Sequence, residues 1–235
     1  MKVEIWSDVM CPFCYIGKRR FESALNQFEN KEDVEIVWKS FQLNPQMKTD
    51  PNKSITEYLA EVKGWTIDYA RQMNAHVTAM AKEVGLEYDF DKAIVANSFD
   101  AHRLVQLAKK HGKGDAAEEG LFRAYFTEGK NIADHSTLAS LAADLGLDKS
   151  EVTDMLAGNR FAEEVEQDVY QAQRYGARGV PFFVMNEKYG VSGAQSSEVF
   201  SEVLEKSFSE WNKERAPKQI ILSEGQTCTP DGDCN

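Results

Sequence analysis

Two cysteines near the start of the chain are separated by two residues, in the motif Cys11-Pro12-Phe13-Cys14. Residues 3–6, ahead of the motif, alternate apolar and charged side chains as a short strand does. Pro12 suits the first position of a helix, where its missing N–H is not needed. The spacing therefore predicts strand, turn and helix, with Cys11 at the N-terminal cap.

A cysteine at this position can react with disulfides. Free backbone amides and the positive end of the helix dipole favour a thiolate at Cys11, and each unit of pKa lowering corresponds to about 1.4 kcal/mol. Cys14, one turn later and closer to the buried face, can then attack a mixed disulfide formed on Cys11. The pattern predicts a redox-active dithiol in which Cys11 is the nucleophile and Cys14 the resolving thiol.

Two other uses of a C-x-x-C pair are disfavoured. Zinc sites with four cysteines have a second pair roughly 15–20 residues away, whereas the next cysteine here is Cys228, so we expect no metal. A purely structural disulfide is disfavoured because a two-residue spacer at a helix start makes a strained bond that is easily reduced.

Composition limits the partners and the compartment. The net charge of −11 disfavours nucleic acid and anionic membranes, and no segment reaches transmembrane length. A strand follows Met1-Lys2 directly, without the pattern of a signal peptide, so we expect a cytoplasmic protein. In a reducing compartment paired cysteines are usually catalytic. We expect protein or small-molecule disulfides and thiols as substrates, the thioredoxin or glutathione system as an exchange partner, and no cofactor.

The pattern along the chain predicts an α/β fold with a helical insertion. A second strand is expected at 34–43. A hairpin is expected from about residue 179, and a last helix from about 197 to 211. Between them helical periodicity is uninterrupted by strands, with helices expected at 54–64, 68–84, 98–111, 115–128, 134–145, 150–157 and 161–175. We expect a core domain of residues 1–50 and 177–212, an inserted all-helical subdomain of 51–176, and a C-terminal tail of 213–235.

Two segments of the sequence resemble those of a known family. They are Ser7-Asp8-Val9-Met10-Cys11-Pro12-Phe13-Cys14-Tyr15-Ile16-Gly17-Lys18 and Asn97-Ser98-Phe99-Asp100-Ala101-His102-Arg103. The chain resembles the DsbA family of thioredoxin-fold oxidoreductases, in its FrnE-like branch, over about residues 1–212. The resemblance implies a thioredoxin fold in which the Val180-Pro181 bond is cis and faces the dithiol. The Val180 backbone would then pair with an extended substrate chain beside Cys11.

One position departs from the family pattern. Several relatives have a buried carboxylate on the first strand, six residues before the nucleophile, but Ile5 occupies that place here. The proton of Cys14 then depends on water or on another group. His102 is a candidate, although a hydrogen-bonded packing role is the more common use of such a histidine. Pro12, Phe13 and His102 are therefore expected to support the motif.

A second pair of thiols, Cys228 and Cys234, lies in the polar tail. The residues between them include Pro230 and Gly232 at favourable turn positions, so a turn would bring the sulfurs together. The tail is also long enough to reach the first dithiol. Two hypotheses stay open: an auxiliary redox pair that exchanges electrons with Cys11 and Cys14 or senses oxidation independently, or a local disulfide.

Three functions compete. The leading one is a thiol-disulfide oxidoreductase, of the protein disulfide oxidoreductase or isomerase kind. The second is a glutathione-dependent isomerase or transferase, because the fold resembles 2-hydroxychromene-2-carboxylate isomerases and kappa-class glutathione transferases. Those enzymes generally have serine at the place of Cys11, which favours the first function. The third is a chaperone-like module that binds in a groove between sheet and insertion.

Overall fold

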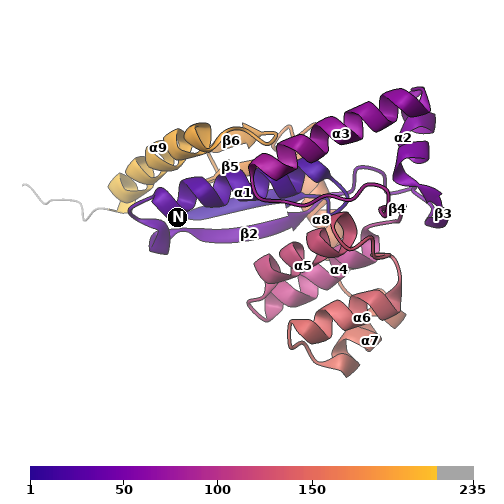
Figure 1. Ribbon diagram of the computed structural model, residues 1–235. Helices are drawn as coiled ribbons and strands as arrows, with labels where there is room; N and C mark the ends of the chain where they lie inside the picture. Colours follow the sequence, from indigo (N-terminus) through magenta and orange to yellow (C-terminus); the bar gives the residue numbers. More distant parts are fainter. Residues whose placement is uncertain (216–235) are drawn as a thin grey trace, which may run out of the picture.

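The structure of the protein is a computed structural model that describes residues 1–215. Cys228, Cys234 and nearly all of the expected tail lie outside the described residues, so the hypotheses about the second pair stay predictions. Figure 1 shows a layered body built around one sheet, with a group of helices projecting from one side of it.

The main sheet has four strands in the order β2-β1-β5-β6. They are β1 (Lys2–Ser7), β2 (Glu35–Ser40), β5 (Phe182–Met185) and β6 (Tyr189–Ser192). β1 and β2 are parallel and joined through α1 (Pro12–Gln27), whereas β5 is antiparallel to both β1 and β6. This mixed sheet with a β-α-β unit and a terminal hairpin confirms the predicted thioredoxin fold.

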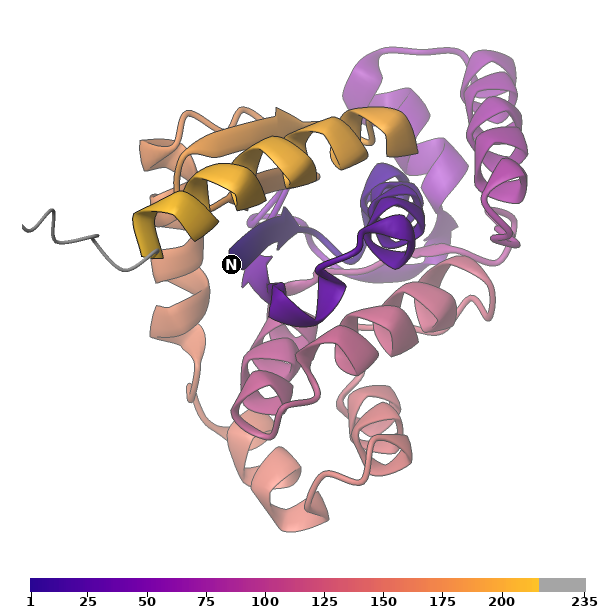
Figure 2. The same ribbon diagram turned by 90° about the vertical axis from the view of Figure 1, so that its left-hand side faces the viewer.

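Alternate residues of the strands point to opposite faces of the sheet, and both faces are covered. One face is covered by α1 and α9 (Ser197–Arg215) (Figure 2). Beneath them the rings of Phe21, Phe183 and Phe200 pack together, with centroids 4.6–5.6 Å apart. On the other face Trp6 is fully buried, and its Nε1 donates a 2.7 Å hydrogen bond to the carbonyl of Asp168 in α8 (Ala162–Arg174). The first turn of α1 is therefore held against a sheet that is packed from both sides.

The predicted helices of the insertion are present, each within about two residues of its expected bounds. They are α2 (Ile55–Lys63), α3 (Ile67–Glu83), α4 (Phe99–Lys110), α5 (Gly114–Phe126), α6 (His135–Asp144), α7 (Lys149–Ala157) and α8. In Figure 1, α4 to α7 lie below the sheet, and α3 runs above it beside α1. The helical insertion predicted from the periodicity is thus confirmed.

Local capping explains why several of these helices begin where they do. The Ser54 hydroxyl accepts from the amide of Glu57 while the Glu57 carboxylate accepts from the amide of Ser54, a reciprocal capping box. Asp134 and Asp148 cap α6 and α7 by accepting from amides three residues later. Capping depends only on residues close together in sequence, so these helix starts can be predicted without the structure.

Three details of the prediction were wrong. The insertion is not free of strands, because β3 (Asp50–Ser54) and β4 (Ile94–Val95) form a short antiparallel ladder. The second strand ends at Ser40 rather than at residue 43, since the amide of Leu43 bonds to the Asp8 carboxylate instead of continuing the sheet. The hairpin strand begins at Phe182, after the bend at Pro181.

Candidate dithiol site

The motif sits where the sequence predicts, at the junction between β1 and α1. Cys11 is the N-cap of α1, with an extended backbone (φ −89°, ψ 113°), and Pro12 is the first helical residue. The turn before it is closed by a 2.8 Å hydrogen bond from the Cys11 amide to the Asp8 carbonyl, and the Cys14 amide donates to the Cys11 carbonyl at 3.0 Å. The two thiols are therefore fixed by the first turn of the helix.

The two cysteines differ in their surroundings. Both are reduced and largely buried, with 5% of Cys11 and 1% of Cys14 exposed, while Phe13 between them is 39% exposed. Burial raises the pKa of the Cys14 thiol well above its usual range, and the neighbouring Cys11 sulfur raises it further. Cys14 is therefore held as a thiol beneath Cys11, as a resolving cysteine would be before its turn in the reaction.

The peptide bond between Val180 and Pro181 is cis, as the resemblance implied. The Sγ of Cys11 donates to the carbonyl of Val180 at 3.5 Å, so this bond lies directly beside the first thiol. Gly17 makes the approach close: a Cβ at that position would lie 3.0 Å from Cγ of Pro181. This role of Gly17 is not visible in the sequence, because only the packed structure brings α1 against this loop.

The acidity expected of Cys11 stays a prediction. In this structure the Cys11 side chain makes no capping hydrogen bond to the helix and instead acts as a donor to Val180. A thiolate cannot donate, so on losing its proton the sulfur would exchange this contact for the free amides of the first turn.

Behind the dithiol, His102 pairs with the buried carboxylate of Asp8, and the buried carboxylate of Glu118 also influences its charge. Ile5 fills its place on β1 with an apolar side chain, while the Nε2 of His102 lies 3.4 Å from Oδ1 of Asp8. Burial opposes the charged ring, yet Asp8 and Glu118 together raise the pKa of His102. Glu118 is fully buried without a hydrogen-bond partner, and burial raises its pKa to about 7. Glu118 was missed by the sequence analysis, because a glutamate on an amphipathic helix ordinarily faces water.

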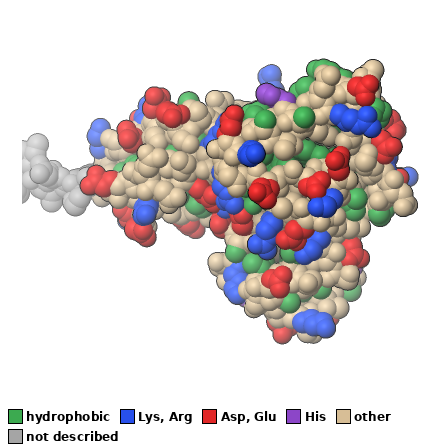
Figure 3. Space-filling view, viewed as in Figure 1, with side chains coloured by type: hydrophobic (Ala, Val, Ile, Leu, Met, Phe, Trp, Pro, Cys, Tyr) green, Lys and Arg blue, Asp and Glu red, His purple; other side chains and the backbone are tan. Residues whose placement is uncertain are grey.

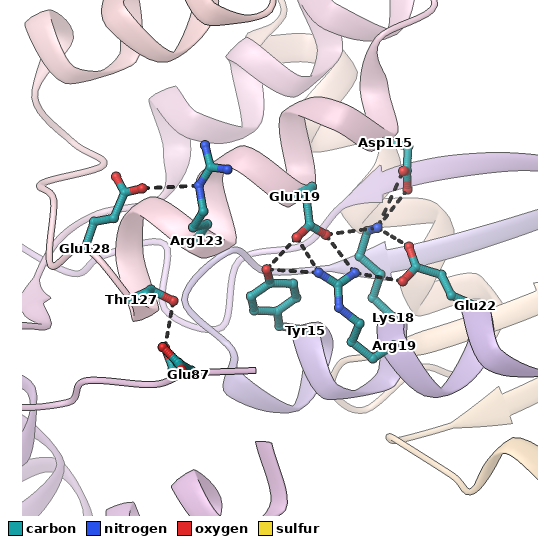
Figure 4. A network of polar contacts seen from close by, with 10 residues as sticks. All are labelled: Tyr15, Lys18, Arg19, Glu22, Glu87, Asp115, Glu119, Arg123, Thr127 and Glu128. Carbon is teal, nitrogen blue, oxygen red and sulfur yellow. Dashed lines mark hydrogen bonds and ion pairs between the residues drawn. The ribbon is translucent and has the colours of Figure 1, made fainter. Parts of the chain in front are cut away.

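A different polar cluster joins α1 to α5, one to two turns beyond the dithiol (Figure 4). Lys18 is only 3% exposed and lies 3.1 Å from Glu119 and 3.4 Å from Asp115, and it also pairs with Glu22. Arg19 forms ion pairs with Glu22 and Glu119. These contacts fasten the helix that carries the dithiol to the insertion.

Acidic and basic side chains are interspersed over the face of the molecule that Figure 3 presents. No helix among residues 1–215 is long and apolar enough to cross a membrane.

Comparison with known proteins agrees with this geometry. Residues 2–205 match the DSBA-like thioredoxin domain family. The chain belongs to this family. A crystal structure of a probable DsbA oxidoreductase from Streptomyces coelicolor is similar over 100% of this chain and 98% of that one, with 37% identity and a TM-score of 0.85. The FrnE-like branch stays a prediction.

More distant proteins are similar to this chain with lower identity. The uncharacterised protein YwbO of Bacillus subtilis is 28% identical over 204 residues, which is 86% of this chain and 94% of that protein. The cytosolic disulfide reductase DsbM from Pseudomonas aeruginosa, solved with GSH, has 20% identity and a TM-score of 0.64, with 89% of this chain and 100% of that chain covered. A 2-hydroxychromene-2-carboxylate isomerase has 16% identity and a TM-score of 0.63, with 94% and 100% covered.

Proposed function

We propose that the protein is a thiol-disulfide oxidoreductase that acts through Cys11 and Cys14. The observation that carries the proposal is the position of the two thiols: Cys11 caps α1 beside the Val180 carbonyl, and Cys14 is buried one turn further on. Membership of the DSBA-like family and the similarity to a probable DsbA oxidoreductase support it.

The chemistry follows from the order of the two thiols. The Cys11 thiolate attacks one sulfur of a substrate disulfide, forms a mixed disulfide and releases the other sulfur as a thiolate. Cys14 then loses its proton and attacks the Cys11 sulfur, which releases the second substrate sulfur and leaves a Cys11–Cys14 disulfide. The substrate gains two electrons and the dithiol loses two; the reverse sequence oxidises a substrate dithiol.

The proton of Cys14 needs an acceptor, because burial holds this sulfur as a thiol. With Ile5 at the place of the family carboxylate, the buried pair of His102 and Asp8 is a candidate for this role, and Asp8 lies in the turn that leads into the motif. We assign proton handling to this pair, with Asp8 also fixing the turn through its bonds to the amides of Met10 and Leu43.

Substrate binding is assigned to the loop opposite Cys11. The carbonyl of Val180 is 3.5 Å from the Cys11 sulfur, so an extended chain that pairs with the Val180 backbone would place its own sulfur beside the nucleophile. Phe13, which is 39% exposed, provides apolar surface within the motif, whereas Pro181 is buried behind the Val180 carbonyl. Protein and small-molecule disulfides both satisfy this contact.

The proposal extends to partners, compartment and domain limits. A neighbour of the same fold is a cytosolic disulfide reductase solved with GSH, which supports exchange with glutathione and a cytoplasmic location. We keep residues 1–50 and 177–212 as the dithiol domain, 51–176 as the insertion and 213–235 as the tail. The direction of exchange depends on the reduction potential of the couple against that of its partner.

Cys228 and Cys234 are proposed as an auxiliary redox pair, with a local disulfide as the competing role. Replacing Cys14 by serine prevents the second attack and preserves any disulfide that forms on Cys11. Mass spectrometry of this variant after mild oxidation is expected to find a crosslink between Cys11 and the tail. Its absence, with the mixed disulfide to added glutathione still present, assigns the tail pair to a local role.

The central test is turnover of a disulfide substrate. Insulin or glutathionylated peptide is offered with reduced glutathione as electron donor, and the Cys11→Ser variant is expected to lose at least about 1,000-fold in rate because no nucleophile remains. The Cys14→Ser variant is expected to accumulate a mixed disulfide on Cys11. A Cys228→Ser, Cys234→Ser protein is the control for loss of thiols in general. Equal rates for wild type and Cys11→Ser would refute the proposal.

A glutathione-dependent isomerase is the second candidate, favoured by the shared fold of a 2-hydroxychromene-2-carboxylate isomerase. It predicts isomerisation of such a substrate with added glutathione and no dependence on Cys14.

A chaperone-like module is the third candidate. A cavity of about 600 Å³ lies between the segment after β2 and the insertion, lined in part by Pro45, Phe99 and Tyr170. This role predicts that a Cys11→Ser, Cys14→Ser protein still suppresses aggregation.

A further inference from the structure

A tyrosine from the insertion reaches the dithiol loop. The hydroxyl of Tyr88 donates a 2.7 Å hydrogen bond to the carbonyl of Pro12, the residue between Cys11 and the rest of the motif. The side chain is 8% exposed and comes from the loop between α3 and β4, more than 70 residues away along the chain. Nothing in the motif itself requires this contact.

The segment that carries Tyr88 is held on both sides. Thr127 donates its hydroxyl to the carbonyl of Glu87 at 2.7 Å (Figure 4), and the amide of Asp89 donates to the carbonyl of Phe126 at 2.7 Å. The ring of Tyr88 stacks on that of Phe126 with centroids 4.6 Å apart. The hydroxyl is therefore presented to Pro12 from a fixed position at the end of α5.

The contact acts on the peptide group between Pro12 and Phe13. A hydrogen bond accepted by a peptide carbonyl polarises the whole amide and strengthens the N–H on its other side as a donor. That N–H belongs to Phe13, the second residue of α1, where a capping side chain normally finds its donor. Cys11 is the cap, so the amide that Tyr88 strengthens is one that a Cys11 thiolate would use.

We propose that Tyr88 is a positioning residue of the dithiol, which stabilises the Cys11 thiolate through the Pro12–Phe13 peptide and so raises the reduction potential of the Cys11/Cys14 couple. The proposal rests on the proposed redox function. Burial and the nearby Cys11 sulfur raise the pKa of Tyr88, so the hydroxyl remains a neutral donor when Cys11 ionises. The insertion would thereby set how oxidising the dithiol is.

Tyr125 provides a matched control. It is also a buried tyrosine of the insertion, and its hydroxyl also donates to a backbone carbonyl, that of Ile94 at 2.9 Å. Tyr125→Phe and Tyr88→Phe each remove one hydroxyl and one hydrogen bond, but only the second touches the dithiol loop. Comparing them separates a general loss of stability from an effect on the sulfurs.

Two measurements test the proposal. In proteins whose only thiol is Cys11, the rate of iodoacetamide alkylation is followed against pH. At a pH below the midpoint of this profile, Tyr88→Phe is expected to lower the thiolate fraction about threefold, and Tyr125→Phe to leave it unchanged. In proteins with both thiols, at a pH above that midpoint, the equilibrium dithiol + GSSG ⇌ disulfide + 2 GSH is expected to move about threefold towards the disulfide, a potential lower by about 14 mV.

A second substitution keeps the test decisive if the first disturbs folding. Incorporation of 3-fluorotyrosine at position 88 keeps the shape of the ring and makes the hydroxyl a stronger donor, so the alkylation profile is expected to move to lower pH. Equal profiles for Tyr88→Phe and Tyr125→Phe, or no change with fluorotyrosine, would overturn the role of Tyr88. The alkylation profile needs no turnover, so it tests Tyr88 separately from the disulfide activity that decides the proposed function.

Discussion

Glu118 and Glu119 are neighbours on α5, yet the structure gives them opposite environments. Glu118 points inward, fully buried and without a hydrogen-bond partner, and burial raises its pKa to about 7. Glu119 points towards α1 and accepts from Arg19 and from the Tyr15 hydroxyl (Figure 4). Although burial opposes it, these bonds lower the pKa of Glu119.

The difference comes from helix geometry rather than from residue type. Successive residues of a helix point about 100° apart, so one glutamate faces the interior near His102 and the other faces the charged cluster of α1. One carboxylate therefore changes charge near neutral pH, whereas the other stays charged and fastens α1 to the insertion. Charged contacts hold α1 beyond its first turn, while the sulfurs of its first turn are buried.

The largest expected effect is on the pH dependence of stability in Glu118→Gln. A carboxyl with a pKa of 4.5 when unfolded and about 7 when folded stabilises the fold below pH 4.5, and this stability is lost as the pH rises to 7. The loss is at most about 3 kcal/mol, at 1.4 kcal/mol per pKa unit. Urea unfolding at pH 5 and pH 8 measures the free energy of unfolding, which is expected to fall less between these pH values in the variant than in wild type. An equal fall in both proteins would contradict this.

Next is the loss of Lys18, the buried centre of the charged cluster. Lys18→Met removes the cation that contacts Glu22, Asp115 and Glu119 together, and Arg19 still pairs only with Glu22 and Glu119. Because these carboxylates are partly exposed, the cost is less than for a fully buried pair, about 2 kcal/mol. Denaturant unfolding at pH 7 measures it. A variant as stable as wild type would show that solvent, rather than Lys18, compensates these charges.

A smaller change, opposite in sign to that of Glu118→Gln at neutral pH, is expected for Glu119→Gln. The charged bonds from Arg19 are weakened, although the amide oxygen can still accept from Tyr15, so we expect a loss of about 1 kcal/mol at pH 7. Since the pKa of Glu119 is lowered by folding, its contribution is lost as the pH falls, and the two proteins are expected to converge in acid. A difference that persists at low pH would contradict the ionic origin.

The smallest effect is expected for an exposed pair. Arg71 lies 3.2 Å from Asp68 on α3, with 69% and 87% of the side chains exposed, and hydration compensates each charge. Arg71→Ala is expected to leave the denaturation midpoint unchanged within error. This variant is the control for removing a cation from the surface. A clear loss of stability would mean that the losses measured for Lys18→Met and Glu119→Gln include a general effect of changing the surface charge.

Local patterns made much of the fold predictable. The helix bounds followed from apolar periodicity and from caps such as Ser54 and Asp148, which act over three or four residues. The place of Cys11 at the helix cap followed from Pro12 and the preceding strand. The ladder of β3 and β4 was missed because β4 has only two residues, and its pairing partner lies 40 residues earlier.

The amino-acid sequence by itself determined the order of helices and strands, the C-x-x-C motif at the start of α1 and the family resemblance that located Pro181. The tertiary structure decided which groups surround the sulfurs: the Val180 carbonyl beside Cys11, the Tyr88 hydroxyl on Pro12, and the contrast between Glu118 and Glu119. Periodicity is a property of neighbours along the chain. Burial and hydrogen-bond partners depend on segments far apart in sequence, and only their packing fixes them.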